Sequence, residues 1–235
     1  MRYLKPLIDS VYIKATDIPD AWFQCISSLL EHGNGYVIEK GSNEGQTRLE
    51  FDWITIEIAY PYKEPYDLML PQIPAHLNIP NPVTEGYVEQ YLPYLLTEHI
   101  SNNELYTYGS RIYQQIQYWS KQLKKTPNTN QAILQVAQPM DVTLLDPPCL
   151  RHIDMRVKER YIDCADDFQS CLIFYPYFRS WDLWGGFPAN LAAIAVLQKM
   201  MADEIGVDVG PIVASSKGLH IYGYVEELAK LRVGK

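Results

Sequence analysis

Apolar residues recur along the chain at two spacings, which predict helices and strands in irregular alternation. Residues 20–32 (DAWFQCISSLLEH) repeat apolar positions near helical spacing and stop at Gly33, a residue typical of helix ends. Residues 53–60 (WITIEIAY) alternate apolar and polar positions, which predicts a strand with one buried face. Further helices are predicted over residues 87–96, 110–125 and 191–205, and further strands over residues 132–137, 151–157, 171–177 and 219–224.

Prolines and the order of the predicted segments indicate one layered domain. Six prolines fall between residues 61 and 82, which excludes a regular helix there and predicts a long ordered loop or crossover. The sequence has no internal repeat and no low-complexity tract that would mark a linker. Because helices and strands alternate irregularly, we predict an α/β or α+β fold in a single domain over residues 1–235.

Composition and charge narrow the class of protein. The 235 residues are 47% hydrophobic and carry a formal net charge of −8, from 20 Lys and Arg against 28 Asp and Glu. That hydrophobic share excludes wholesale disorder. The negative charge makes a nucleic-acid polymer or an anionic membrane surface a poor partner. A small anionic ligand stays compatible with it, because one local arginine pocket can override the global field.

Cysteine usage and the apolar runs predict a reduced, cytoplasmic protein. Cys25, Cys149, Cys164 and Cys171 contain no CxxC pair, so we expect neither a disulfide framework nor a metal site. The start of the chain lacks the apolar core of a signal peptide, and no run of eighteen apolar residues occurs. We therefore expect a cytoplasmic protein without a membrane partner.

The segment DPPCLRH, residues 146–152, is the first of four that carry candidate chemistry. Two prolines make the approach to Cys149 rigid, and a predicted strand follows. A thiol held at a strand edge can act as a nucleophile where a nearby cation lowers its pKa, and Arg151 is close in sequence. The alternative is an inert buried cysteine, which is the commoner case.

The segment FRSWDLWGGFPAN, residues 178–190, offers groups for a phosphate and a base. Arg179 and Ser180 suit a phosphate dianion through charge-assisted hydrogen bonds. The amide of Asn190 has both a donor and an acceptor, which can pair with the edge of a pyrimidine. We expect Arg179, Ser180 and Asp182 to lie together in a turn ahead of the alanine-rich helix. The alternative is a capped helix with a surface ion pair between Arg179 and Asp182.

Two tyrosine-bearing segments complete the set. In a strand, His220 and Tyr222 of GLHIYGY share a face, where they suit the hydroxyls of a sugar. A structural histidine is the alternative. In YTYGSR, Tyr108 precedes a predicted glycine turn and alone indicates little. Together, a thiol, an Arg–Ser pair, an amide and a His–Tyr pair would bind a nucleoside monophosphate. A nucleophile that adds to pyrimidine C6 makes C5 carbanion-like, so that C5 can accept a one-carbon electrophile.

In this order and spacing, the motifs resemble those of the thymidylate synthase family. The segment PPC at residues 147–149 is similar to the family's nucleophile motif. RSWDLWGGFPANLAAIAVL at residues 179–197 is similar to its RSxDxxxGxPxN signature and the following helix. HIY at residues 220–222 resembles its late HxY element, and Tyr108 with Gly109 its active-site Tyr-Gly. The compact length resembles the short archaeal-type branch.

The resemblance implies a fold, a partner and a reaction. It implies a three-layer fold whose mixed, bulged sheet packs at the interface of a homodimer. It also implies one-carbon transfer to C5 of dUMP to give dTMP, with 5,10-methylene-tetrahydrofolate or a methanopterin analogue as the cosubstrate. Because Asn at position 190 accepts uracil in this family, whereas Asp favours cytosine, uracil is the expected base. These residues do not distinguish ribose from deoxyribose.

The resemblance further implies a role for each candidate residue. Cys149 would attack C6 of the base, and Tyr108 would assist removal of the C5 proton. Asn190 would contact N3 and the 4-position. The remaining implied contacts are Arg179 and Ser180 to the 5′-phosphate, His220 and Tyr222 to the 3′-hydroxyl, and Asp182 with Gly186 to the pterin.

The sequence also departs from the family pattern. Leu150 follows the nucleophile where the family has His, and Phe178 precedes the RS pair where the family has Gln. The arginine pair that the family donates across the dimer to the phosphate should fall at residues 130–131, which are Asn and Gln. These departures weaken the expectation of ordinary methylation more than the expectation of pyrimidine C5 chemistry.

The departures leave two roles and the product open. Arg48 or Arg111 is our candidate for the replacement phosphate contact, and Glu89 for the catalytic glutamate that relays protons to the base. The sequence ends VEELAKLRVGK, without the apolar-acidic tail that closes over the pterin in the family. Weaker exclusion of water would favour hydroxymethylation. The alternatives to dTMP formation are thus a dUMP, dCMP or CMP 5-hydroxymethylase and a catalytically silent nucleotide-binding homologue.

Overall fold

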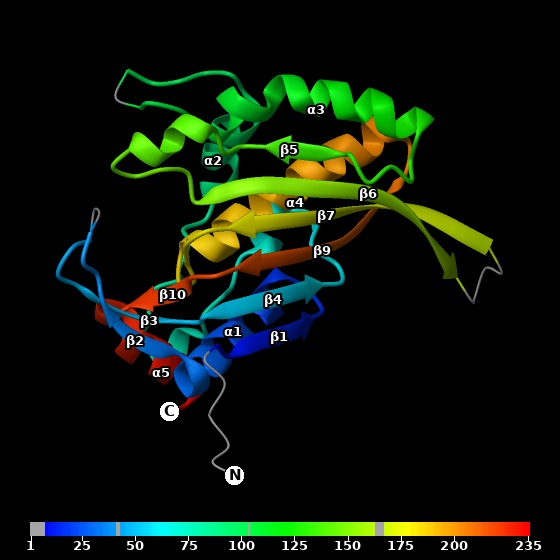
Figure 1. Ribbon diagram of the computed structural model, residues 1–235. Coiled ribbons are helices and arrows are strands. Elements are labelled where there is room, and N and C mark those ends of the chain that lie inside the picture. Colours follow the sequence, from blue (N-terminus) through cyan, green and yellow to red (C-terminus); the bar gives the residue numbers. More distant parts are fainter. Residues whose placement is uncertain (1–7, 41–42, 103, 163–166) are drawn as a thin grey trace, which may run out of the picture.

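A six-stranded mixed sheet and a smaller four-stranded sheet organise the chain (Figure 1). The computed structural model describes residues 8–40, 43–102, 104–162 and 167–235. The large sheet has the order β1 (Ser10–Ala15), β4 (Trp53–Ile58), β9 (Asp208–Ser216), β7 (Asp167–Phe178), β6 (Leu150–Ile162) and β5 (Ile133–Gln135). The small sheet has the order β2 (Asn34–Val37), β3 (Thr47–Glu50), β10 (Leu219–Tyr222) and β8 (Trp181–Asp182).

Helix α4 is the middle layer of the fold. The α-helices of the described residues are α1 (Ile18–His32), α2 (Tyr87–Leu96), α3 (Tyr108–Lys125), α4 (Gly186–Ile205) and α5 (Glu226–Val233). Helix α4 contacts β7 and β9 on one side and α1, α2 and α3 on others. Most of its residues are buried, which is the behaviour of a helix that is apolar all round. The predicted three-layer α+β fold is confirmed.

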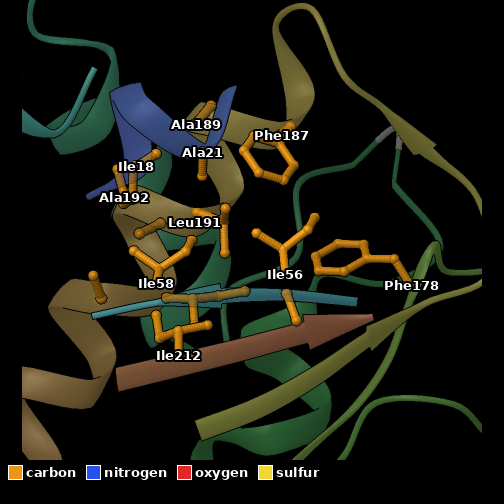
Figure 2. Close-up of a cluster of buried hydrophobic side chains, with 14 of the residues drawn as sticks. Ile18, Ala21, Ile56, Ile58, Phe178, Phe187, Ala189, Leu191, Ala192 and Ile212 are labelled. Carbon is orange, nitrogen blue, oxygen red and sulfur yellow. The ribbon is translucent and has the colours of Figure 1, made fainter. Parts of the chain in front are cut away.

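The hydrophobic core lies between the large sheet and helices α1 and α4 (Figure 2). Ile56 and Ile58 of β4 and Ile212 of β9 point from the sheet toward Ile18 of α1 and Leu191 of α4. All five side chains are fully buried, and each contributes about 1.5–3 kcal/mol through removal from water. The alternate residues of β4 are more exposed, so the predicted one-sided strand is confirmed.

The large sheet is mixed and bulged, as predicted. Strand β6 is antiparallel to β7, whereas β9 is parallel to β7, and the register shifts once in each pairing. At the shift between β7 and β9, the buried amide of Gln198 in α4 donates to the carbonyls of Leu172, Gly210 and Pro211 at 2.8, 3.1 and 3.3 Å. A polar residue inside the apolar helix thus satisfies backbone groups that the irregular strand pairing leaves free.

Two predictions at helix starts were wrong. Tyr108 and Gly109 do not form a turn but begin α3, because the Thr107 hydroxyl accepts from the Ser110 N–H at 3.0 Å and caps the helix. A Cβ at Gly109 would lie 2.2 Å from the Thr97 carbonyl oxygen, so this position requires glycine for close approach rather than for a turn. Helix α4 begins at Gly186, five residues ahead of the predicted start at 191.

Several short elements were not predicted. The missed strands are β1, β2, β3, β8 and β9, and the missed helix is α5. Strand β8 contains Asp182, which was expected in a turn. Other boundaries agree closely: α2 spans the predicted residues 87–96, and β10 begins at Leu219 as expected. The proline-rich segment 61–82 holds only the short 3-10 turns Tyr66–Met69 and Ala75–Leu77, which confirms a loop.

None of the helices in the described ranges combines the length and apolar character needed to cross a lipid bilayer. In the same ranges, no group of three or more His, Cys, Asp or Glu side chains could hold a metal ion. Cys25, Cys149 and Cys171 are free thiols, and Cys149 is the partly exposed one of these three. Cys164 lies outside the described residues.

Candidate active site

Cys149 follows two prolines at the start of β6, and Arg179 clamps this turn from the end of β7. The Arg179 backbone N–H donates to the Cys149 carbonyl at 2.9 Å. Its Nε donates to the Pro148 carbonyl at 3.2 Å, and its Nη2 donates to the Pro147 carbonyl. The same Nη2 lies 3.2 Å from the Asp146 carboxylate. Thus one arginine, with five N–H donors, fixes the backbone that carries the thiol.

The Cys149 thiol is partly buried beside charges of both signs. Burial raises its pKa, the Arg179 guanidinium lowers it, the Asp146 carboxylate raises it and Arg151 lowers it, with a net increase. The nucleophile is the thiolate, and the two arginines are the groups here that favour it. Access and nearby cations distinguish Cys149 from an inert core cysteine.

Tyrosines surround the thiol. Burial, followed by the charge of Cys149, raises the pKa of Tyr106 to about 12 and raises that of Tyr108 further. The Tyr108 hydroxyl accepts from the Leu150 N–H at 3.4 Å, one residue from the thiol. The Tyr94 ring packs edge-on against Tyr108, with centroids 5.1 Å apart. Tyr108 therefore keeps its hydroxyl proton at neutral pH.

Arg111 is committed to a buried ion pair. Its two terminal nitrogens lie 2.7 and 2.8 Å from the Asp141 carboxylate, and one of them also donates to the Val136 carbonyl at 2.9 Å. Its guanidinium lies 4.3 Å from the centre of the Tyr106 ring. The side chain is only 9% exposed. These contacts do not support Arg111 as a phosphate contact, because they occupy its guanidinium on the core side.

Arg48 is placed next to a predicted sugar contact. In the small sheet, Arg48 of β3 pairs in register with Tyr222 of β10. Its Nε lies 2.7 Å from the Glu50 carboxylate, without the geometry of a hydrogen bond. The side chain is 29% exposed. Of the two candidate replacements, Arg48 is therefore the one with the more exposed side chain, although it is paired with Glu50.

Asp182 caps the start of the turn that leads into α4. Its carboxylate accepts from the N–H groups of Trp184, Gly185 and Gly186 at 3.2, 3.0 and 2.9 Å. Three donors of this kind fix the position of the carboxylate. A Cβ at Gly186 would lie 3.4–3.5 Å from Asp182 and 3.8 Å from the Asn190 amide oxygen, so this turn sits directly between two predicted site residues.

The amide of Asn190 is held at both ends. Its Oδ1 accepts from the Trp181 indole N–H at 3.0 Å, and its Nδ2 donates to the Tyr91 hydroxyl at 3.0 Å. Glu89 lies two residues from Tyr91 on α2, but it is exposed. The residue of α2 that faces the site is thus Tyr91, and this geometry does not support Glu89 as the proton relay.

His220 and Tyr222 share a face of β10, as predicted, with ring centroids 4.8 Å apart. His220 is 3% exposed, and its Nδ1 lies 2.9 Å from the Gly218 carbonyl. Burial lowers its pKa, so the ring is neutral at neutral pH. Its Nε2 has no hydrogen-bond partner among the described residues. The Tyr222 hydroxyl accepts from the Asn43 amide at 3.0 Å.

Leu150 and Phe178, the two residues that depart from the family pattern beside the motifs, lie opposite each other in the large sheet. Leu150 and Phe178 are in register across β6 and β7, and both are 0% exposed. They line one small internal void with Tyr108 and Asn190. Two positions at which the resemblance implied polar residues therefore hold an apolar pair in this chain. Residues 130–131 lie exposed just ahead of β5. They are Asn and Gln, so neither supplies a cation.

One short segment joins the separate motifs. Residues 179–182 begin with Arg179 on the Cys149 turn, continue through half-buried Ser180 and end in β8, where Asp182 pairs with His220 of β10. The charge of Asp182 and, more weakly, that of Cys149 add to burial in raising the pKa of Tyr222. The predicted thiol, phosphate, sugar and pterin groups therefore form one cluster.

Sequence reasoning missed two residues of this cluster, Trp181 and Tyr91. A signal for Tyr91 was present, because tyrosines at 87, 91 and 94 recur at helical spacing and their rings stack along α2, 6.1 and 5.4 Å apart. Trp181 stands inside the RSWD segment, but nothing in that pattern indicates a bond to Asn190.

Comparisons with known proteins identify the family of this chain. The family model described as thymidylate synthase matches residues 92–234, which include Cys149, Arg179, Asn190 and His220. Proteins named "Putative thymidylate synthase" are similar along nearly their whole length. That of Methanosarcina mazei is 28% identical over 230 residues, covering 93% of this chain and 94% of its own. That of Methanothermobacter thermautotrophicus is 26% identical over 222 residues, covering 89% and 92%.

A solved structure shares the fold. Thermostable thymidylate synthase A from Bacillus subtilis superposes with a TM-score of 0.69, covering 94% of this chain and 85% of that chain, at 18% identity. The family model covers more than half of the 235 residues and contains the cluster built around Cys149. The chain therefore belongs to the thymidylate synthase family.

Proposed function

We propose that the protein transfers a one-carbon unit to C5 of dUMP and forms dTMP, with a 5,10-methylene-tetrahydropterin as cosubstrate. The observation that carries this proposal is the Arg179 clamp on the Cys149 turn. It sets a partly exposed thiol beside a guanidinium, and the same segment leads to Asp182 and the Asn190 helix. A nucleotide with its phosphate at Arg179 would then present its base to the thiol.

The binding groups suit a nucleoside monophosphate. Arg179 and Ser180 offer donors to a phosphate dianion, and Arg48, partly exposed and paired with Glu50, is a second cation at the small sheet. A phosphate would compete with the Asp146 carboxylate and the proline carbonyls for the Arg179 donors. The buried His220 Nε2, which lacks a partner among the described residues, suits a sugar hydroxyl, because a bond there would satisfy it.

The chemistry follows from the thiol and the amide. The Cys149 thiolate would form a bond to C6, and the C5–C6 π electrons would move toward C5 and O4. Asn190 would stabilise that charge through its amide N–H. After one-carbon transfer, the C5 proton leaves, with the Tyr108 hydroxyl as a relay that does not itself ionise. Loss of this proton lets the bond between the one-carbon unit and the pterin nitrogen break, which leaves an exocyclic methylene on C5. Hydride addition to that methylene, with oxidation of the tetrahydropterin to a dihydropterin, gives the methyl group as the S–C6 bond breaks and restores the thiolate.

The residues near α4 fit a pterin. The Asp182 carboxylate is oriented by three backbone donors and has acceptor capacity left for an N–H of a pterin ring. Tyr222 and Tyr224 present parallel rings 5.5 Å apart on the side of Asp182. A bound methylene-tetrahydropterin supplies the one-carbon unit and the hydride. These residues would orient it, and Gly186 would leave room beside the carboxylate.

We propose a homodimer through the open face of the large sheet. Helices α1 and α4 cover the other face. On the open face Trp53 stacks on Tyr177 with centroids 5.9 Å apart, and the tilted His152 ring lies 5.6 Å from Tyr177. Trp53 is 37% exposed and the neighbouring Tyr12 56%. A second copy would cover this aromatic surface. Analytical ultracentrifugation should give twice the monomer mass, and Trp53→Glu should shift the protein to the monomer.

A covalent trap tests the function. Incubation with 5-fluoro-dUMP and methylene-tetrahydrofolate, or its methanopterin counterpart, should add the mass of nucleotide and pterin to the protein. Cys149→Ala should abolish the adduct, and Cys25→Ala is the matched control that should keep it. No adduct with either pterin in the folded protein would contradict the proposal. Chromatography of the product from dUMP distinguishes dTMP from hydroxymethyl-dUMP, and the latter would overturn the methylation step alone.

A further inference from the structure

Two side chains that take no part in the proposed reaction, Trp181 and Tyr91, hold the Asn190 amide. The Trp181 indole N–H donates to Oδ1, and Nδ2 donates to the Tyr91 hydroxyl, both at 3.0 Å. An amide has two acceptor sites on oxygen and two hydrogens on nitrogen. Each partner occupies one of them. Asn190 therefore keeps one acceptor site and one N–H for a ligand.

The two partners constrain the amide differently. An indole N–H only donates, so it requires the oxygen end of the amide. A tyrosine hydroxyl both donates and accepts, so it would tolerate either end. Turning the amide over would set two donors against each other at Trp181, inside the core, where an unmatched donor is costly. The indole alone therefore fixes which end of the Asn190 amide lies where.

Packing keeps the indole in place. Trp181 is 2% exposed. Its ring stacks on Phe178 with centroids 3.9 Å apart and an interplanar angle of 6°, and it lies 4.7 Å from Phe187. Both phenylalanines are fully buried. The ring cannot turn its N–H away from Asn190 without disrupting this stack.

We propose that Trp181 is a positioning residue that sets the choice of base by fixing the Asn190 amide in one orientation. This rests on the proposed function, in which Asn190 reads a pyrimidine edge. Uracil presents a donor at N3 and an acceptor at position 4, and cytosine presents the reverse. A fixed amide can match one of these edges, and a freely turning amide can match both.

The test is the ratio of the dissociation constants for dCMP and dUMP, measured by calorimetry. The wild-type protein should prefer dUMP. Trp181→Phe keeps an aromatic ring but removes the N–H, and it should lower the ratio about tenfold, mainly through tighter dCMP binding. Tyr91→Phe is the matched control: it removes the other partner of the same amide and should leave the ratio within about twofold. If Trp181 had only a structural role, Trp181→Phe would weaken the binding of dCMP and dUMP alike and leave the ratio unchanged.

A second variant covers the case in which Trp181→Phe does not fold. Benzothienylalanine at position 181 keeps the shape of the indole and replaces its N–H by sulfur, so it should lower the ratio in the same way. An unchanged ratio in the folded variants, or a wild-type protein without preference for dUMP, overturns the proposal. Dissociation constants need no turnover, so a protein that prefers dUMP but forms no covalent adduct contradicts the proposed function alone. Binding of neither nucleotide overturns both.

Discussion

Cys25 and Cys149 are free thiols of one chain in opposite surroundings. Cys25 is fully buried in α1, where burial raises its pKa far above the ordinary value and the charge of Asp20 adds to the increase. Cys149 is partly exposed, and Arg179 and Arg151 oppose the effect of its burial. We infer from this contrast that access and nearby cations are what would make a cysteine reactive. Residue type alone does not make it reactive.

The largest difference expected between the two regions is the loss of activity when each cysteine is replaced by alanine. Cys149→Ala should reduce dTMP formation on the order of 10⁴-fold or more, because no other group can form the bond to C6. Cys25→Ala should retain the turnover number of the wild type per folded molecule. Steady-state kinetics of both variants measure this. Equal losses in the two would remove the distinction between the sites.

Removing the cation that clamps the Cys149 turn should have the next largest effect. Arg179→Gln should lower kcat/KM for dUMP about 100-fold, because it loses charge-assisted bonds to the phosphate and raises the pKa of the thiol. Arg151→Gln is the control, since Arg151 is the smaller influence on that pKa. A loss as large in Arg151→Gln would show that net charge near the thiol matters more than the clamp.

The pH dependence of alkylation should differ between the thiols. Because the pKa of Cys149 is above its ordinary value, its thiolate fraction and its rate with iodoacetamide should rise about tenfold per pH unit from neutral pH upward. Mass spectrometry of the folded protein should find Cys25 unmodified over the same range. In Arg179→Gln the whole Cys149 profile should shift to higher pH. A rate plateau near neutral pH would contradict the raised pKa.

The smallest effects are expected on stability, where Cys25→Ala should lose more unfolding free energy than Cys149→Ala. Cys25→Ala should cost about 1 kcal/mol of unfolding free energy, because it leaves a small cavity in the packed core. Cys149→Ala, at a partly exposed turn, should cost about half of that or less. Urea denaturation of the two variants compares them. A larger loss for Cys149→Ala would mean that its turn is part of the core.

Periodicity in the sequence predicts only elements that obey one spacing throughout. The segment WITIEIAY keeps an alternation of two and was found, whereas β9 contains Gly210 and Pro211, residues typical of turns. Pairing with β7 and the bonds from Gln198 hold those two residues in a strand. Contacts of this kind join distant parts of the chain, and no local pattern contains them.

The candidate site shows the same limit. Cys149, Arg179 and Asn190 stand in motifs with fixed spacing, so the sequence alone predicts them as site residues. Glu89 and Tyr91 lie on one helix but about 200° apart around its axis, and only the packing of α2 on α4 decides which of them faces Asn190. The choice between Arg48 and Arg111 had the same ambiguity, because the burial of Arg111 against Asp141 is a long-range contact.

Because Leu150 and Phe178 pair across β6 and β7, we expect these two positions to vary together among related sequences. A single change to histidine or glutamine at either position would place a polar group in a void whose other polar groups, the Tyr108 hydroxyl and the Asn190 amide, are already hydrogen-bonded. An unmatched buried polar group costs about 1–3 kcal/mol, which favours a change at both positions together. Related sequences that keep one form at the first position should keep the same form at the second.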